Sequence, residues 1–402
     1  NGFISRLRTN LNLFSQKHHR YLATSSILSS GDKTPLTSKD KTRAALTLLK
    51  SESNPEKILE ICRAAALTPE SHLDRLAFSI AINKLSEANY FNGISQYLEE
   101  LKTRPDLQNE RFHAHSIILY GQANMTEHAV RTFKEMDEHK LRHSVGAFNA
   151  LLLALTIAKD YKEVKRVFIE FPKTYGIKPD LDTYNRVIKA FCESSDSSSA
   201  YSILAEMDRK SIKPNASSFG ALVAGFYKEE KYEDVNKVLQ MMERYGMKSG
   251  VSMYNVRIHS LCKLRKCAEA KALLDEMLSK GMKPNSVTYS HFIYGFCKDG
   301  NFEEAKKFYR IMSNSGLSPN SSVYFTMVYF MCKGGDYETA LGFCKESIAK
   351  GWVPNFTTMK SLVTGLAGAS KVSEAKELIG LVKEKFTKNV DTWNEIEAGL
   401  PQ

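Results

Sequence analysis

The chain repeats itself every 35 residues, and this period constrains its fold more than any other feature. Three segments begin alike, with Leu181-Asp-Thr-Tyr-Asn, Val251-Ser-Met-Tyr-Asn and Ser286-Val-Thr-Tyr-Ser. Three segments end alike, with Ile212-Lys-Pro-Asn, Met282-Lys-Pro-Asn and Leu317-Ser-Pro-Asn. A fixed period of this length is typical of a solenoid, in which each repeat buries its apolar face only against its neighbours.

The repeat frame divides most of the chain into ten consecutive units. The clearest are 181–215, 216–250, 251–285, 286–320 and 321–355. Before them lie 145–180, with one extra residue near Tyr175, then 110–144 and 75–109, and weaker units fit at 40–74 and 356–390. The frame leaves residues 1–39 as an N-terminal segment and residues 391–402 as a short C-terminal capping helix.

Each unit is expected to contain two helices, which makes the predicted fold all-α. In unit 251–285 a first amphipathic run reaches about Lys263, and a second covers 268–279. Gly281 is a helix stop signal, and Asn285 suits the N-cap of the next unit. Alanine recurs at position 20 of the unit and methionine at position 27, as expected for packed positions.

Four of the seven cysteines follow the same period. They occupy position 12 and are Cys192, Cys262, Cys297 and Cys332. This placement indicates core packing rather than a disulfide framework, and the absence of any Cys-x-x-Cys argues against a zinc site. We therefore expect no metal, no cofactor and a reducing compartment.

The period of 35, tyrosine at position 4, Cys-Lys at positions 12 and 13, alanine at position 20 and the Gly-x-Lys-Pro-Asn ending resemble the pentatricopeptide repeat family, in its P class. The tetratricopeptide repeat is less similar, because its period is 34 and its first-helix Trp and Leu-Gly pair are missing here. The resemblance covers residues 40–390. It implies a right-handed superhelical solenoid of about ten helix-turn-helix units that binds single-stranded RNA.

Catalytic motifs are missing from the sequence. No histidine begins the His-x-Glu of an editing deaminase, and there is no P-loop and no Gly-x-Ser-x-Gly. The histidines between 113 and 143 share no convincing helical face, which favours ordinary packing over a metal cluster. We expect a protein that is not an enzyme and has no small-molecule substrate.

The resemblance also implies which side chains face RNA bases, because the family reads bases with positions 5 and 35 of each unit. The candidates are Ser79, Asn109, Asn149, Asp180, Asn185, Asn215, Asn255, Asn285, Ser290 and Asn320. The alternative stays open, since Asn and Asp at position 35 also cap the following helix without any RNA. Position 2, which sandwiches bases in the family, suits stacking only at Leu76 and Val287, so base contacts are expected to be weak.

Lysines recur more regularly than the base-facing candidates. The phosphate candidates are Lys228, Lys263, Lys298 and Lys333 at position 13, and Lys178, Lys213, Lys248 and Lys283 near position 33. Together with a net charge of +11, they favour an anionic partner bound through its phosphates. A solvated charged face is the alternative.

The N-terminal segment resembles an organellar transit peptide. Its first 31 residues contain no acidic residue, and an amphipathic stretch runs from Phe3 to Phe14. Arg20-Tyr21-Leu22-Ala23 resembles a mitochondrial processing site with cleavage after Leu22. A disordered basic arm is the alternative. We expect a location in the mitochondrial matrix, and no apolar run is long enough to span a membrane.

Three functions remain possible at this point. Segments beginning at Lys50, Ala158 and Lys383 are similar to short plant mitochondrial members of the family found in the small ribosomal subunit. This similarity favours a structural rRNA-binding component that contacts mitochondrial ribosomal proteins and supports translation. The alternatives are a transcript-specific mRNA-binding factor and a protein-only scaffold.

Overall fold

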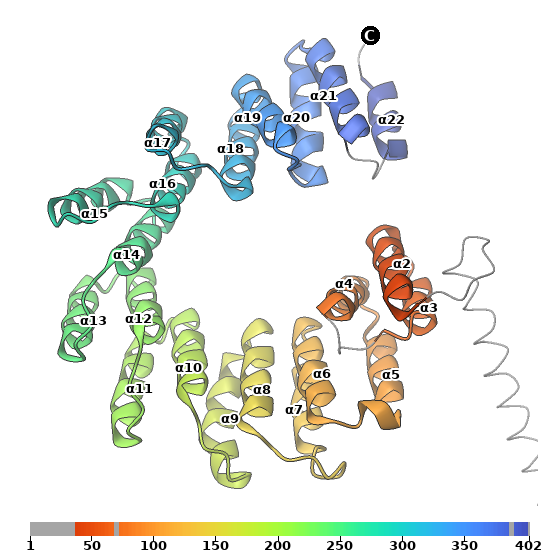
Figure 1. Cartoon of the computed structure of the whole chain (residues 1–402), viewed down its shortest axis with the longest axis vertical. Coiled ribbons are helices and arrows are strands. Elements are labelled where there is room, and N and C mark those ends of the chain that lie inside the picture. Colours follow the sequence, from red (N-terminus) through yellow and green to blue (C-terminus); the bar gives the residue numbers. More distant parts are fainter. Residues whose placement is uncertain (1–36, 68–71, 386–389, 401–402) are drawn as a thin grey trace, which may run out of the picture. The chain divides into compact units, whose positions relative to one another are not determined.

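The structure is a computed structural model that describes residues 37–67, 72–385 and 390–400 (Figure 1). Within these ranges the chain forms helices and no strand. The predicted transit peptide and processing site lie in residues 1–36, outside the described part.

The helices come in pairs, one pair for each unit of the sequence frame. The first helices are α2 (Ser38–Ser51), α4 (His72–Glu87), α6 (Glu110–Gln122), α8 (Val145–Ile157), α10 (Leu181–Glu193), α12 (Ala216–Lys228), α14 (Val251–Lys263), α16 (Ser286–Lys298), α18 (Ser321–Gly334) and α20 (Phe356–Gly368). The second helices are α3 (Pro55–Ala64), α5 (Phe91–Lys102), α7 (Thr126–Lys134), α9 (Tyr161–Thr174), α11 (Ser197–Arg209), α13 (Tyr232–Arg244), α15 (Cys267–Ser279), α17 (Phe302–Asn314), α19 (Tyr337–Ala349) and α21 (Val372–Lys385). A 3₁₀ turn, η1 (Pro105–Leu107), follows α5, and α22 (Val390–Ala398) follows α21.

The chain divides into two compact units, one ending at Lys213 and the other beginning at Pro214. In the first compact unit, the first helices of successive repeats pack side by side, with α6 on α8 and α8 on α10. The second unit repeats this arrangement through α12, α14, α16, α18 and α20 (Figure 1). Each second helix packs on its own first helix, so the expected all-α helical-repeat solenoid is confirmed.

Two turns recur in every well-formed repeat. Between the two helices, position 15 adopts a left-handed backbone, for example at Glu230 and Arg265. After the second helix, Gly281 has a φ of 72°, and the backbone N–H of Met282 donates to the carbonyl of Met277 at 3.1 Å. This pattern satisfies the last carbonyls of α15, as the stop signal at Gly281 predicted.

The core is built from residues that recur at fixed repeat positions. The position-20 alanines (Ala129, Ala200, Ala270, Ala305, Ala340 and Ala375) are all fully buried. All seven cysteines are buried with free thiols, and burial raises the pKa of Cys297 and Cys332 to about 12. Their predicted role in core packing is confirmed. Among the described residues, no helix combines the length and apolar character needed to cross a membrane.

Close approach of neighbouring first helices gives a test of this packing. At Gly121 in α6, an added Cβ would lie 2.5 Å from the backbone Cα of Ala154 in α8. We expect Gly121→Ala to lower the free energy of unfolding by about 1–3 kcal/mol, because α8 must move. Urea denaturation followed by circular dichroism measures this change.

Gly342 in α19 is the matched control, since nothing lies within 4 Å of a Cβ built there. Gly342→Ala should raise the free energy of unfolding by about 0.5–1 kcal/mol through helix propensity alone. Equal effects of the two substitutions would contradict the close packing of α6 on α8.

Candidate nucleic-acid interface

The position-35 candidates cap the first helix of the following repeat. Their side-chain oxygens accept backbone N–H groups at 2.8–3.1 Å, which holds for Asn109, Asp180, Asn215, Asn285 and Asn320. An N-cap of this kind stabilises a helix by about 1 kcal/mol. The capping alternative therefore describes what these oxygens do in the structure.

Asn149 and Asn255, at position 5, form the same set of hydrogen bonds in two repeats. Each amide oxygen accepts the hydroxyl of a threonine on the next first helix, Thr183 or Thr288, at 2.7 Å. The amide nitrogen of Asn149 donates to Asp180 at 3.2 Å, and that of Asn255 donates to Asn285 at 3.2 Å. Both side chains are only 7% exposed, so a base would have to displace contacts that hold two repeats together.

The other position-5 candidates hydrogen-bond within the protein or lie half-buried. The hydroxyl of Ser79 donates to Gln122 at 3.1 Å, and that of Ser290 donates to the carbonyl of Ser286 at 2.7 Å. Asn185 lies half-buried on α10. Partial burial opposes ionisation of Asp180, but hydrogen bonds from Thr183 and Asn149 outweigh it and lower the pKa of that carboxyl. Base readout by these pairs stays a prediction.

The phosphate candidates form two separate sets. The position-13 lysines (Lys228, Lys263, Lys298 and Lys333) lie at the C-terminal ends of α12, α14, α16 and α18. The position-33 lysines (Lys178, Lys213, Lys248 and Lys283) are all exposed and precede the N-termini of α10, α12, α14 and α16. Twelve helical residues separate the two ends by about 18 Å, so one phosphate contacts only one set.

The position-13 lysines are exposed, except for the half-buried Lys298. The ammonium of Lys298 donates to the backbone carbonyl of Lys263 at 2.7 Å, which caps the end of α14. Neither Lys263 nor Lys333 joins an ion pair among the described residues. The same position in the first compact unit carries no lysine but Glu87, Gln122, Ile157 and Glu193. The basic series therefore belongs to the second compact unit.

Sequence reasoning missed an aromatic group beside these lysines. Position 9 carries His259, Tyr294 and Tyr329 in three consecutive repeats, and Phe330 follows at position 10. The recurrence at position 9 was visible in the sequence, but only the structure shows that these rings are partly exposed and in contact.

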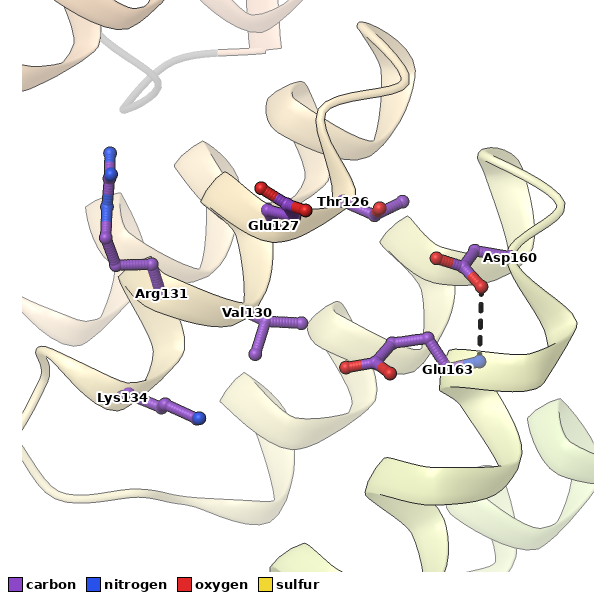
Figure 2. A pocket seen from close by; sticks show the side chains of 7 residues that line it. All are labelled: Thr126, Glu127, Val130, Arg131, Lys134, Asp160 and Glu163. Atoms are coloured by element: carbon purple, nitrogen blue, oxygen red, sulfur yellow. Dashed lines mark hydrogen bonds between the residues drawn. The ribbon is translucent and has the colours of Figure 1, made fainter.

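A groove between α7 and α9 is lined by Thr126, Glu127, Val130, Arg131, Lys134, Asp160 and Glu163 (Figure 2). Asp160 caps α9 by accepting the backbone N–H of Glu163 at 3.2 Å. The carboxylate of Glu163 pairs with Arg166, and Arg131 pairs with Glu135 at 3.3 Å. Asp160, Glu163 and Arg131 thus stabilise the helices that form this groove.

Two histidines of the first compact unit are buried within the protein. His113 is buried with Nδ1 2.9 Å from the carbonyl of Asn109, and Nε2 of His143 lies 2.7 Å from the carbonyl of Phe133. Among the described residues, no three histidine, cysteine or acidic side chains gather as a metal site would require.

The Asn255 hydrogen bonds generate a stability prediction. Asn255→Ala removes the acceptor of Thr288 and the donor to Asn285, and should lower the free energy of unfolding by about 1–3 kcal/mol. Urea denaturation measures the loss. The control is Asn236→Ala on the exposed face of α13, which should change the free energy by no more than about 0.5 kcal/mol. A neutral Asn255→Ala would show that this amide is available for RNA.

Comparison with known proteins identifies the repeat. The PPR repeat family model matches residues 179–228, 249–298 and 287–333, and the pentatricopeptide repeat domain model matches 131–194. A PPR repeat model also matches 117–141 and 217–247. The matches lie between residues 117 and 333 and fall in both compact units.

Among curated proteins, a mitochondrial pentatricopeptide repeat-containing protein of Arabidopsis thaliana is 54% identical over 402 residues, covering 100% of this chain and 99% of the relative. A small ribosomal subunit protein of the same plant is 33% identical over 42% of this chain and 43% of its own length. The solved pentatricopeptide repeat protein PPR10 from maize aligns with a TM-score of 0.48 and 16% identity, covering 90% of this chain and 56% of that one. The identity to the first relative along its whole length shows that the chain belongs to the pentatricopeptide repeat family.

Proposed function

We propose that the chain is an RNA-binding protein of mitochondria that holds structured RNA through its phosphates, as an rRNA-binding component of the small ribosomal subunit. The position-13 lysines carry this proposal, because they recur on four consecutive first helices of one compact unit. A series of cations at a fixed spacing binds a phosphate backbone without reading its sequence.

Several position-5 and position-35 side chains support phosphate recognition over base reading. The amides of Asn149 and Asn255 are buried in hydrogen bonds between repeats. The oxygens of Asn215 and Asn285 cap helices. Few donors and acceptors are left for an extended single strand, whereas folded RNA is recognised mainly by shape and phosphates.

The relatives support the location and the assembly. The relative that matches this chain along its whole length is named as mitochondrial, and one that matches over less than half is named as a small ribosomal subunit protein. The acid-free N-terminal segment suits import into the matrix. The partners would be rRNA and mitochondrial ribosomal proteins, and the chain would act by binding rather than by catalysis, without a cofactor or small-molecule substrate.

Charge reversal tests the lysines. The variant carries Lys228→Glu, Lys263→Glu, Lys298→Glu and Lys333→Glu. Affinity for a small-subunit rRNA fragment should fall at least tenfold at low salt, and the slope of log K against log salt should decrease by about 3 as four phosphate contacts are lost. Filter binding from 50 to 300 mM KCl measures both quantities.

A matched control variant distinguishes direct phosphate contact by the position-13 lysines from a general effect of the lower net charge. It reverses four exposed lysines on or next to second helices, namely Lys162, Lys173, Lys350 and Lys376. This control should keep most of the wild-type salt slope. If both variants lose affinity and slope equally, the position-13 lysines have no special role.

Sedimentation tests the assembly. A mitochondrial lysate is run on sucrose gradients with and without EDTA, and fractions are blotted for the protein. Co-migration with the small subunit after EDTA separates the subunits, persisting at moderately high salt, is the expected result. Migration in light or RNase-sensitive fractions would instead favour the transcript-specific mRNA-binding factor.

A further inference from the structure

Five aromatic side chains form a continuous series across three neighbouring first helices. They are His259 on α14, His291 and Tyr294 on α16, and Tyr329 and Phe330 on α18, and we call them the ring cluster. Ring centroids lie 4.3 Å apart for His259 and His291, and 6.3 Å apart for His259 and Tyr294. The series continues from Tyr294 to Phe330 at 6.0 Å and from Phe330 to Tyr329 at 5.0 Å.

The ring cluster is not part of the buried core. Tyr329 is 48% exposed, and the other four side chains are partly exposed. The core tyrosines at position 4, such as Tyr254 and Tyr324, are 1% exposed by comparison. Large rings left partly in water on one face are typical of a binding surface rather than of packing.

Each position-9 ring lies four residues before a position-13 lysine on the same helix. The pairs are His259 with Lys263, Tyr294 with Lys298, and Tyr329 with Lys333. Residues four apart are neighbours on a helix surface, so the three position-9 rings and the three position-13 lysines form two adjoining rows across these helices. Positions 9 of the first compact unit hold Asn83, Ile118, Leu153 and Lys189, without any aromatic residue.

The two histidines act as neutral rings. Burial lowers the pKa of His291 to about 4, with smaller effects from His259 and Lys263, and burial also lowers the pKa of His259. The Nδ1 atom of His259 is buried without a hydrogen-bond partner among the described residues. A buried polar atom of this kind usually has a hydrogen-bond partner, so its lack of one is unusual.

We infer that the ring cluster is a stacking site for unpaired RNA bases, and that the adjoining position-13 lysines hold the phosphates of the same nucleotides. Every base presents a π-face, so rings bind unpaired bases without a sequence code, while lysines neutralise the backbone. The site would therefore select loops or bulges of a folded RNA over continuous duplex. This inference rests on the proposed RNA binding. It specifies the kind of RNA structure that the second compact unit contacts.

The test compares two RNA probes of equal length, a fluorescent single-stranded oligouridine and a perfect duplex, with the full chain and its variants. Tyr329→Ala removes the most exposed ring. Single-strand affinity should fall about fivefold or more, while duplex affinity and the salt slope stay at wild-type values. Tyr294→Ala combined with Tyr329→Ala should lower single-strand affinity further.

Two further variants separate stacking from other effects. Tyr329→Phe keeps the ring without its hydroxyl and should bind single-stranded RNA with wild-type affinity. Phe91→Ala removes a ring on α5 that is 38% exposed and should leave affinity unchanged. Photocrosslinking with 4-thiouridine should label peptides that contain Tyr294 or Tyr329.

The outcomes distinguish the two proposals. Wild-type protein that binds neither probe overturns RNA binding and the stacking site together. Wild-type protein that binds both probes, with the double variant unchanged on single strands, overturns only the stacking site. Equal losses on duplex and single strand would also overturn it, because paired bases offer no free face.

Discussion

The structure depends on contact between the first helices of successive repeats. One repeat supplies too little apolar surface for a core of its own, so the residues that fix the fold face a neighbour. At Gly295 in α16, an added Cβ would lie 2.7 Å from the Cβ of Cys262 in α14, which shows how closely the helices approach. The position-12 cysteines, which lie on first helices and are buried, are small enough to permit such an approach.

This contact also decides which groups can reach a ligand. Asn149 and Asn255 lie where two first helices meet, and their amides satisfy the hydroxyls and caps of the next repeat. Such bonds are costly to break once buried. In the second compact unit, positions 9 and 13 carry rings and lysines that these contacts leave at least partly exposed. Stacking and phosphate neutralisation are the chemistry that these side chains offer.

The sequence predicted the helix pairs, the stop at Gly281 and the core cysteines, because these follow from spacing and local backbone preference. It could not decide between capping and base reading at Asn285, since one residue type serves both roles and only the accepted N–H of Thr288 shows the cap. The sequence grouped the lysines of positions 13 and 33 as phosphate candidates, and the structure places the two sets at opposite ends of a first helix. The sequence did not predict the ring cluster, because His291 and Phe330 lie at other repeat positions than the position-9 rings. Only the distances between rings show that they form one group.

The buried positions that hold the fold and the exposed positions that we propose for recognition are different positions of the same repeat. The residues at the two sets of positions can therefore change independently. Position 13 carries Glu87, Ile157 and Glu193 in the first compact unit and lysines on four first helices of the second, while the first helices keep a similar length and pack side by side in both. Exposed substitutions of this kind change stability by only about 0.5 kcal/mol, so surface chemistry can change without loss of the solenoid. The fold therefore depends on buried positions such as 4 and 20, whereas the side chains that we propose for RNA binding lie at positions 9 and 13.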